Sequence, residues 1–190
     1  MNNKQRILQS ALELFNEKGS HKVSTNHIGD HCGISPGNLY YHFKNKEAII
    51  FELFIQMIEE WEEDSHQLDK VLLTDEVLMI MLQKSGAFFW KYRFIHKELI
   101  FLAENDPRLR EKNDQIQAVR MQQLNDLVDN NIKAKILRQL TVDEKTFFVD
   151  SLWMGSLFWQ PYLEVTGQSN TPDNVERITH HFLTLFHLFR

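Results

Sequence analysis

The sequence has few cysteines, glycines and prolines, and it lacks a long apolar run. Cys32 is the only cysteine among the 190 residues, which excludes an intrachain disulfide framework. No apolar stretch approaches the roughly 20 residues that a membrane-spanning helix needs, and the first residues lack the apolar core of a signal peptide. We therefore expect a protein of the reducing cytoplasm that makes no contact with a membrane.

Strand patterns and flexible linkers are also missing. The seven glycines and four prolines do not cluster, and no convincing stretch alternates apolar and polar residues as a half-buried strand does. Apolar residues instead recur at helical spacing over most of the chain. The sequence predicts an all-α fold of about nine helices, at about 3–18, 25–32, 36–43, 45–67, 75–90, 94–105, 107–131, 143–164 and 172–189, with 132–140 as either helix or loop.

The N-terminal quarter contains the local signals of a helix-turn-helix. Ser24 or Thr25 can cap the first of two short helices, and Gly33 can end it because glycine accepts left-handed backbone. Ser35 can cap the second helix, with Pro36 at its first position, where a missing N–H costs nothing. This pattern predicts a three-helix head whose second short helix lies in the major groove of DNA.

The two faces of that second helix differ in chemistry. Leu39 and Phe43 lie four residues apart and are expected to be buried, together with Ile28, Cys32 and Ile34 of the preceding helix and turn. The opposite face carries tyrosine, histidine and asparagine side chains. Tyrosine and histidine suit phosphates and base edges, and asparagine can form two hydrogen bonds with an adenine edge. We expect this face to contact DNA, with flanking lysines on phosphates.

Charge is distributed unevenly along the chain, whose formal net charge is −5. Residues 1–50 contain six Lys and Arg against four Asp and Glu, so they carry +2 and the remainder carries −7. An N-terminal part that attracts phosphate and a C-terminal part that repels it are typical of a protein with one nucleic-acid-binding end.

The head resembles the tetracycline-repressor (TetR) family of bacterial transcriptional regulators over roughly residues 4–54. The residues that match the family pattern are Thr25, Ile28, Cys32, Gly33, Ile34, Ser35, Leu39, Tyr40, His42, Phe43 and Lys46. Gly29 departs from the family's usual alanine, which should cost the helix up to about 1 kcal/mol. From the resemblance and the exposed face together, the expected DNA contacts are Thr25, Ser35, Pro36, Gly37, Asn38, Tyr40, Tyr41, His42, Lys44 and Lys46.

The resemblance implies a DNA-binding domain at residues 1–46 and an effector-binding and dimerisation domain at residues 47–190. It also implies a homodimer on a palindromic operator of double-stranded DNA, because two heads on two half-sites bind more tightly than one short helix. The expected function is that of a ligand-responsive transcriptional repressor. The alternative is a regulator that is controlled by a protein partner, without a small-molecule effector.

Aromatic residues gather in the C-terminal part, where most of them should form core or dimer contacts. Some are expected to line a pocket for a small apolar or aromatic effector, namely Phe88, Phe89, Tyr92, Phe101 and Trp153. The last two helices carry residues that are expected at a dimer interface, namely Phe147, Leu152, Gly155, Phe158, Phe182, Leu185, Phe186 and Phe189. Burial of these residues within one chain is the alternative.

Catalysis, cofactor binding and metal binding are not expected. The sequence has no nucleophile–base pair, phosphate-binding loop or metal motif. His180 and His181 are adjacent and point about 100° apart on a helix, so together with His187 they do not converge on a metal. His96 and Glu98 are interpreted as a solvated pair.

Overall fold

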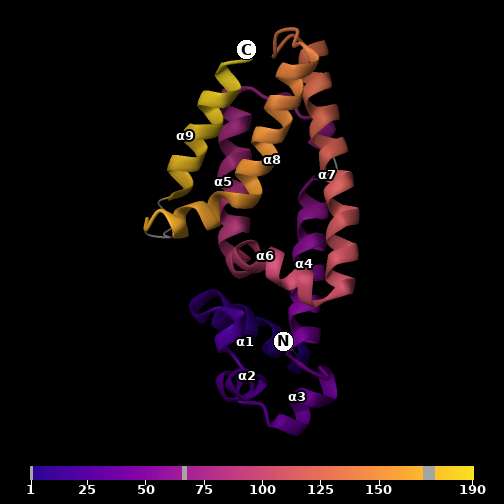
Figure 1. Cartoon of the computed structure of the whole chain (residues 1–190), viewed down its shortest axis with the longest axis vertical. Coiled ribbons are helices and arrows are strands. Elements are labelled where there is room, and N and C mark those ends of the chain that lie inside the picture. Colours follow the sequence, from indigo (N-terminus) through magenta and orange to yellow (C-terminus); the bar gives the residue numbers. More distant parts are fainter. Residues whose placement is uncertain (1, 66–67, 169–173) are drawn as a thin grey trace. The chain divides into compact units, whose positions relative to one another are not determined.

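The computed structural model describes residues 2–65, 68–168 and 174–190. These residues form no strand, which confirms the predicted all-α fold (Figure 1). The helices are α1 Asn3–Lys18, η1 Ser20–Lys22 (3-10), α2 Thr25–Cys32, α3 Pro36–His42, α4 Lys46–Ser65, η2 Leu68–Lys70 (3-10), α5 Asp75–Lys91, α6 Arg93–Asn105, α7 Pro107–Lys133, α8 Val142–Val165 and α9 Asn174–His187.

The helix boundaries that can be compared lie within one or two residues of the predicted ones. The predicted end of α4 at residue 67 and the predicted start of α9 at residue 172 lie outside the described residues. The segment 132–140, left open between helix and loop, continues α7 to Lys133 and is then turn and loop. Lys135 in that loop has a φ of 60°.

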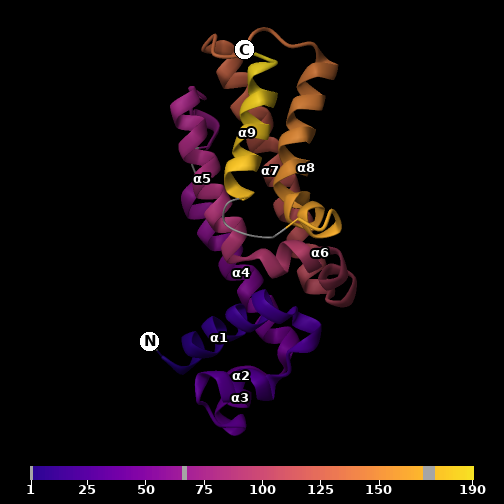
Figure 2. The same ribbon diagram turned by 90° about the vertical axis from the view of Figure 1, so that its left-hand side faces the viewer.

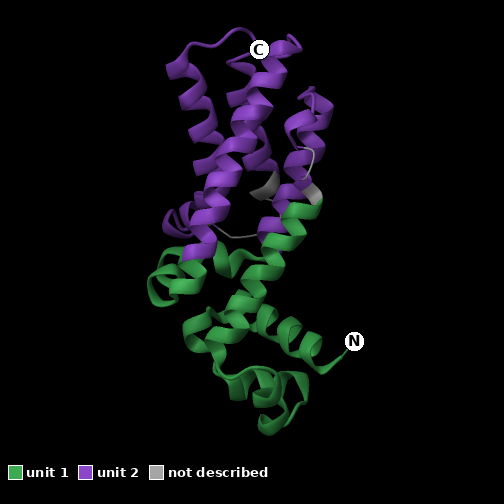
Figure 3. Ribbon diagram, turned by 90° about the vertical axis from the view of Figure 1, so that its right-hand side faces the viewer, with its two compact units in different colours: residues 1–64, 92–110 green, residues 65–91, 111–190 purple. Residues whose placement is uncertain are grey.

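The chain divides into two compact units (Figure 3). The first contains residues 1–64 and 92–110, and the second contains residues 65–91 and 111–190. Most of α4 and all of α6 therefore belong to the same unit as the helix-turn-helix. The units do not follow the expected functional boundary between residues 46 and 47, which stays a prediction.

Local capping shapes the helix-turn-helix as predicted. The Ser24 hydroxyl accepts a hydrogen bond from the His27 backbone N–H, and the His27 ring accepts one from the Ser24 N–H, which satisfies two N–H groups at the start of α2. Gly33 ends α2 with φ 64° and ψ 37°, in the left-handed region. The Ser35 hydroxyl accepts from the Asn38 N–H at 3.4 Å and caps α3.

The core of the first unit is built around α1, which packs against α2, α3 and α6. Ile28, Leu39 and Phe43 are buried there, as predicted. α6 joins this core through Phe94, whose ring lies 5.1 Å from that of Phe15 and whose N–H donates to the Asn16 side chain at 3.1 Å. The unit is thus closed by a helix that follows the head by nearly 50 residues in sequence.

The second unit is a helical bundle in which α9 lies beside both α5 and α8 (Figures 1 and 2). Its buried residues come from α5, α7, α8, α9 and the loops between them, and they include Leu78, Leu127, Val128, Phe148, Val149, Ile178, Phe182 and Phe186. Asn131 is fully buried and satisfies its amide by accepting from Leu73 N–H and donating to the Val71 and Leu127 carbonyls. These bonds tie residues 71–73 to α7.

Candidate nucleic-acid interface

The outer face of α3 is polar, aromatic and exposed. Tyr41 and Tyr40 are 84% and 52% exposed, whereas Leu39 and Phe43 are buried and hold the helix on the head. Asn38 is half-buried on the same helix. Two exposed tyrosines on a short helix contribute nothing to the core, so this face has the chemistry of a surface that contacts phosphates and bases.

A basic concavity of about 430 Å³ lies beside this face, within the first unit. It is lined by polar and cationic side chains from η1, α2, α3 and the start of α4, including His21, Lys22, Thr25, Tyr40, Lys44 and Lys46. None of its lining residues is acidic. The Thr25 and Tyr40 hydroxyls lie 3.1 Å apart and face the same space. Three ammonium groups and two hydroxyls around one hollow suit a phosphate of the DNA backbone.

Lys46 is held in place by a hydrogen bond inside the head. Its ammonium donates to the Ser20 carbonyl at 2.8 Å, and it sits at the start of α4, where the Asn45 side chain caps the helix by accepting from the Ala48 N–H at 2.9 Å. An ammonium has three N–H donors. One bond fixes its position and leaves donors for a phosphate oxygen.

Glu98 and His96 were paired wrongly from the sequence. His96 is only 8% exposed, and burial lowers its pKa to about 4, so the imidazole is neutral at pH 7. Glu98 binds Ser20 instead, accepting from its backbone N–H at 2.9 Å and from its hydroxyl. Residues two apart on a helix point in different directions, which is why they do not pair.

Family models match the chain in two successive segments. Residues 7–53 match the model of bacterial regulatory proteins of the tetR family, and residues 56–190 match the model of a bacterial transcriptional repressor. The second match alone covers more than half of the chain. The chain belongs to the TetR family. It is therefore a DNA-binding transcriptional regulator with a helix-turn-helix head.

Individual relatives agree with this family. The HTH-type transcriptional regulator UidR of Escherichia coli K12 is 49% identical over 51 residues, which are 27% of this chain and 26% of that protein. The match thus spans about a quarter of that relative's length. A TetR-family regulator from Marinobacter aquaeolei VT8 has a crystal structure with a TM-score of 0.85 and 32% identity, covering 100% of this chain and 91% of that one.

A more distant structure shares the fold. FadR from Bacillus subtilis, solved in complex with stearoyl-CoA, has a TM-score of 0.66 and 16% identity and covers 94% of this chain and 96% of that one. At this identity the similarity shows a common fold and nothing more.

The residues expected to line an effector pocket are divided between the units of this TetR-family regulator. Phe88, Phe89 and Trp153 belong to the second unit, and Tyr92 and Phe101 to the first. Tyr92 is buried, its hydroxyl donates to Glu60 at 2.7 Å, and burial together with this bond raises its pKa. Phe101 is 57% exposed, so the described residues do not cover it. The site itself stays a prediction.

The residues expected at a dimer interface fall into two groups. Phe182, Leu185, Phe186 and Phe189 are buried in the core of the second unit, and the prediction that they contact a partner is wrong. Gly155 serves the same core, since a Cβ there would lie 2.7 Å from the Phe182 ring. Leu152 packs against this core as well. The intrachain alternative holds for the four residues of the C-terminal helix region, because α9 directs its apolar face toward α5 and α8. For Leu152 and Gly155, which are half-buried, the interface stays a prediction.

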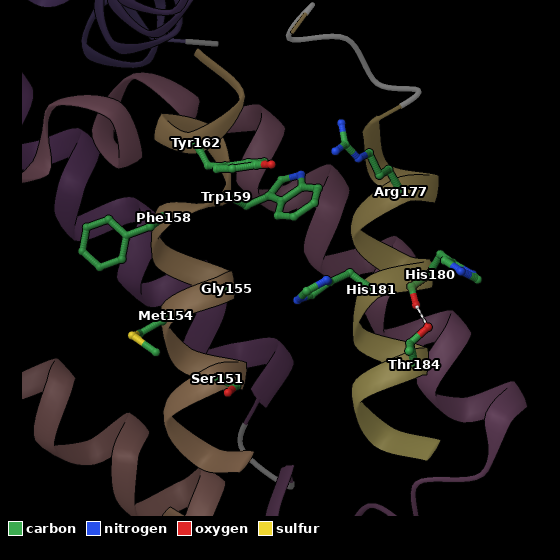
Figure 4. A pocket seen from close by; sticks show the side chains of 10 residues that line it. All are labelled: Ser151, Met154, Gly155, Phe158, Trp159, Tyr162, Arg177, His180, His181 and Thr184. Carbon is green, nitrogen blue, oxygen red and sulfur yellow. Dashed lines mark hydrogen bonds between the residues drawn. The ribbon is translucent and has the colours of Figure 1, made fainter. Parts of the chain in front are cut away.

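An apolar stripe on α8 remains exposed. It contains two residues from the predicted interface, Phe147 and Phe158, and one that was missed, Met154. Their spacing of seven and four residues places them on one side of a helix. Tyr162 is also exposed, but it follows Pro161 and its ring lies beside that of Trp159. Figure 4 shows Met154 and Phe158 pointing away from α9. The sequence shows this spacing, but it also shows apolar residues on the opposite, buried side of α8. Sequence alone therefore does not tell which of the two sides is exposed.

Beside this stripe lies a groove of about 640 Å³ between α8 and α9. Trp159 and His181 point toward one another across it, with ring centroids 5.9 Å apart (Figure 4). The Arg177 guanidinium lies 6.0 Å from the Trp159 ring. The groove continues the aromatic character of the α8 surface onto α9.

In the part of the chain that the structure describes, no group of three or more His, Cys, Asp and Glu side chains is placed to hold a metal ion. His187 contacts Asp75 at 3.2 Å, whereas the His181 ring lies tilted beside the Trp159 ring. Within the same residues, no helix combines the length and apolarity that a bilayer crossing requires.

Proposed function

We propose that this TetR-family regulator is a homodimeric, ligand-responsive repressor that binds a palindromic operator in the bacterial cytoplasm. The observation that carries the proposal is the pairing of an exposed α3 face with a basic concavity that contains no acidic residue. Asn38 and Tyr41 on α3 would contact base edges, and Lys44 and Lys46 would hold phosphates. The proposal assigns no catalytic activity to the chain.

Dimerisation is supported by the exposed stripe on α8. Exposed apolar patches with polar rims usually mark a surface that another protein covers, and a stripe along one helix can meet its own copy across a two-fold axis. Two heads related by that axis would bind half-sites about 34–36 Å apart, or a multiple of this distance. The operator should therefore be a palindrome.

A small apolar or aromatic effector is supported by similarity to FadR, which was solved in complex with stearoyl-CoA. The segment 56–190 matches the repressor model, and it contains Phe88, Phe89, Tyr92 and Trp153 as candidate contacts. An effector that binds one state more tightly than the other shifts DNA affinity by a coupling of about 1–3 kcal/mol. The alternative remains control by a protein partner.

Selection of genomic DNA fragments by the purified full-length protein, at low and at moderate salt, tests the proposal. We expect one enriched palindrome that survives the higher salt, because base contacts persist while nonspecific phosphate binding weakens. Loss of all enrichment at moderate salt would overturn operator recognition.

Once the operator is known, a second experiment titrates fatty acyl-CoA compounds against the complex of protein and operator. Unchanged affinity with every compound, but release by a cellular protein, would establish the alternative.

A further inference from the structure

We propose that Glu98 on α6 is a positioning residue for phosphate binding by the head. It holds η1, and through η1 it holds the Lys46 ammonium at the basic concavity. This inference rests on the proposed phosphate contacts of Lys46 and its neighbours. It adds a residue that lies far from the helix-turn-helix in sequence and outside the concavity itself.

The carboxylate of Glu98 accepts two hydrogen bonds from Ser20, the first residue of η1. One oxygen accepts from the Ser20 backbone N–H at 2.9 Å, and the other accepts from the Ser20 hydroxyl. Ser20 is 2% exposed, so both bonds are shielded from water on the serine side. Hydrogen bonds to a charged acceptor are stronger than neutral ones, and shielding strengthens them further.

The same serine holds Lys46. The Ser20 carbonyl accepts from the Lys46 ammonium at 2.8 Å, so a single residue receives Glu98 on its N–H and hydroxyl and Lys46 on its carbonyl. His21 and Lys22 of η1, followed by Val23 and Ser24, line the concavity together with Lys46. A shift of Ser20 would therefore displace cationic groups on two sides of the concavity.

Two further features of the region around Ser20 accommodate the Glu98 carboxylate and hold it in place. Gly19 has a φ of 82°, and a Cβ there would lie 3.3 Å from Glu98 Oε1 and 2.9 Å from the His21 ring. Glycine thus gives the carboxylate room and allows the turn into η1. α6 is fixed on α1 by the bond from Phe94 N–H to Asn16, which places Glu98 on a rigid support.

The direction of the change in DNA affinity when Glu98 is removed distinguishes a positioning role from a purely electrostatic one. Removing a carboxylate from the head raises its charge by one, and charge alone would then strengthen binding to a polyanion. If Glu98 positions Lys46, its removal weakens binding. The two explanations thus predict opposite changes in the dissociation constant.

The test measures binding of the full-length protein to a fluorescent 30-base-pair duplex of arbitrary sequence, over a series of NaCl concentrations. Lys46→Ala calibrates the assay, because loss of one phosphate contact should lower the salt slope by about one unit. Glu98→Ala should weaken binding about five- to tenfold and lower the slope by a similar amount. Glu98→Gln keeps an acceptor for the Ser20 N–H, so it should stay within about twofold of the wild type.

The matched control is Glu104→Ala, which removes the same charge from an exposed position of the same helix. It should leave binding unchanged or slightly tighter. Adding Glu98→Ala to Lys46→Ala should change the affinity by less than it does in the wild type, because the part of the effect that passes through Lys46 is already lost. Ser20→Ala, which loses only the hydroxyl bond, should weaken binding less than Glu98→Ala.

The outcomes distinguish the two proposals. If Lys46→Ala leaves binding unchanged, the proposed phosphate contact fails. If Lys46→Ala weakens binding but Glu98→Ala behaves like Glu104→Ala, the positioning role is overturned and the phosphate contact stands. Should Glu98→Ala not fold by circular dichroism, Ser20→Ala decides: wild-type affinity and salt slope in that variant would overturn the inference.

Discussion

At the scale of single residues, the head separates side chains that should recognise base sequence from side chains that should hold the DNA backbone. Asn38 lies on α3, the second helix of the helix-turn-helix, and its side-chain amide offers both a hydrogen-bond donor and an acceptor. Lys44 and Lys46 line the basic concavity and offer only positive charge and donors. Amides can discriminate between bases, whereas ammonium groups bind any phosphate.

Replacement of Asn38 by alanine tests this division. The variant should lose about 1–3 kcal/mol of discrimination at one base pair of each half-site, because a bidentate contact to adenine would be removed. Competition binding with operators changed at single positions measures it. Equal weakening on every sequence, as expected for Lys46→Ala, would show that Asn38 does not contact a base.

His96 should make stability depend on pH. Burial lowers its pKa to about 4, below the ordinary value of 6.5, so the unfolded chain binds a proton more readily between these values. The free energy of unfolding should therefore be fully retained above about pH 7 and fall as pH decreases, by about 2 kcal/mol at pH 5 and by up to about 3 kcal/mol at pH 4.

Urea unfolding of the wild type and His96→Gln at pH 7.5 and pH 5 measures this contribution. The difference in stability between the two pH values should shrink in the variant, since the glutamine does not titrate. The same pH dependence in both proteins would contradict a buried neutral imidazole.

At the scale of elements, α6 packs in a different unit from α5, the helix that precedes it in the sequence. It lies within the segment 56–190 that matches the repressor model, yet it packs with α1 in the unit that contains the helix-turn-helix. Its contacts with Asn16 and Ser20 are made over 78 residues of chain. A helix of the regulatory segment thus takes part directly in the structure of the DNA-binding unit.

α8 and α9 illustrate a close approach that only glycine permits. A Cβ at Gly155 would lie 2.7 Å from the tip of the buried Phe182 ring. Gly155→Ala gains up to about 1 kcal/mol in helix propensity but overpacks the core at a cost of about 1–3 kcal/mol. With the full propensity gain, we expect a net loss of about 0–2 kcal/mol in the free energy of unfolding.

Urea unfolding measures this loss, and Gly37→Ala provides the control. No atom lies within 4 Å of a Cβ at Gly37, so that substitution should leave stability unchanged or slightly raised. A Gly155→Ala variant more stable than the wild type would show that the Phe182 ring can move aside.

At the scale of the whole molecule, the proposed dimer depends on the exposed side of α8. Phe158→Glu places a charge within the apolar stripe and should raise the dimer dissociation constant at least about tenfold, equivalent to about 1.4 kcal/mol. Analytical ultracentrifugation measures the oligomeric state. DNA binding by the variant should weaken as well, because two linked heads bind more tightly than separate ones.

The matched control is Ile80→Glu. Ile80 on α5 is 49% exposed and Phe158 is 48% exposed, so both substitutions place a carboxylate at a similar degree of exposure. Ile80→Glu should leave the dimer intact. Dissociation by both variants, or by neither, would contradict a dimer interface centred on α8.

The sequence by itself determined the features that depend on neighbouring residues. The caps at Ser24 and Ser35, the left-handed turn at Gly33 and the buried face of α3 follow from interactions over four residues or fewer. The same signals, together with the family pattern, predicted the all-α fold and the helix-turn-helix. Of the residues that line the basic concavity, they identified Thr25, Tyr40, Lys44 and Lys46 but missed His21, Lys22, Ser24 and Asn45.

Only the tertiary structure decided which distant surfaces meet. An apolar face looks the same in sequence whether its own chain or a partner covers it, so Phe182 and Phe186 were assigned to an interface when they belong to the core. Glu98 carries no local sign that it binds Ser20, 78 residues earlier. Helical periodicity specifies which side chains share a face, whereas packing of whole helices determines what that face contacts.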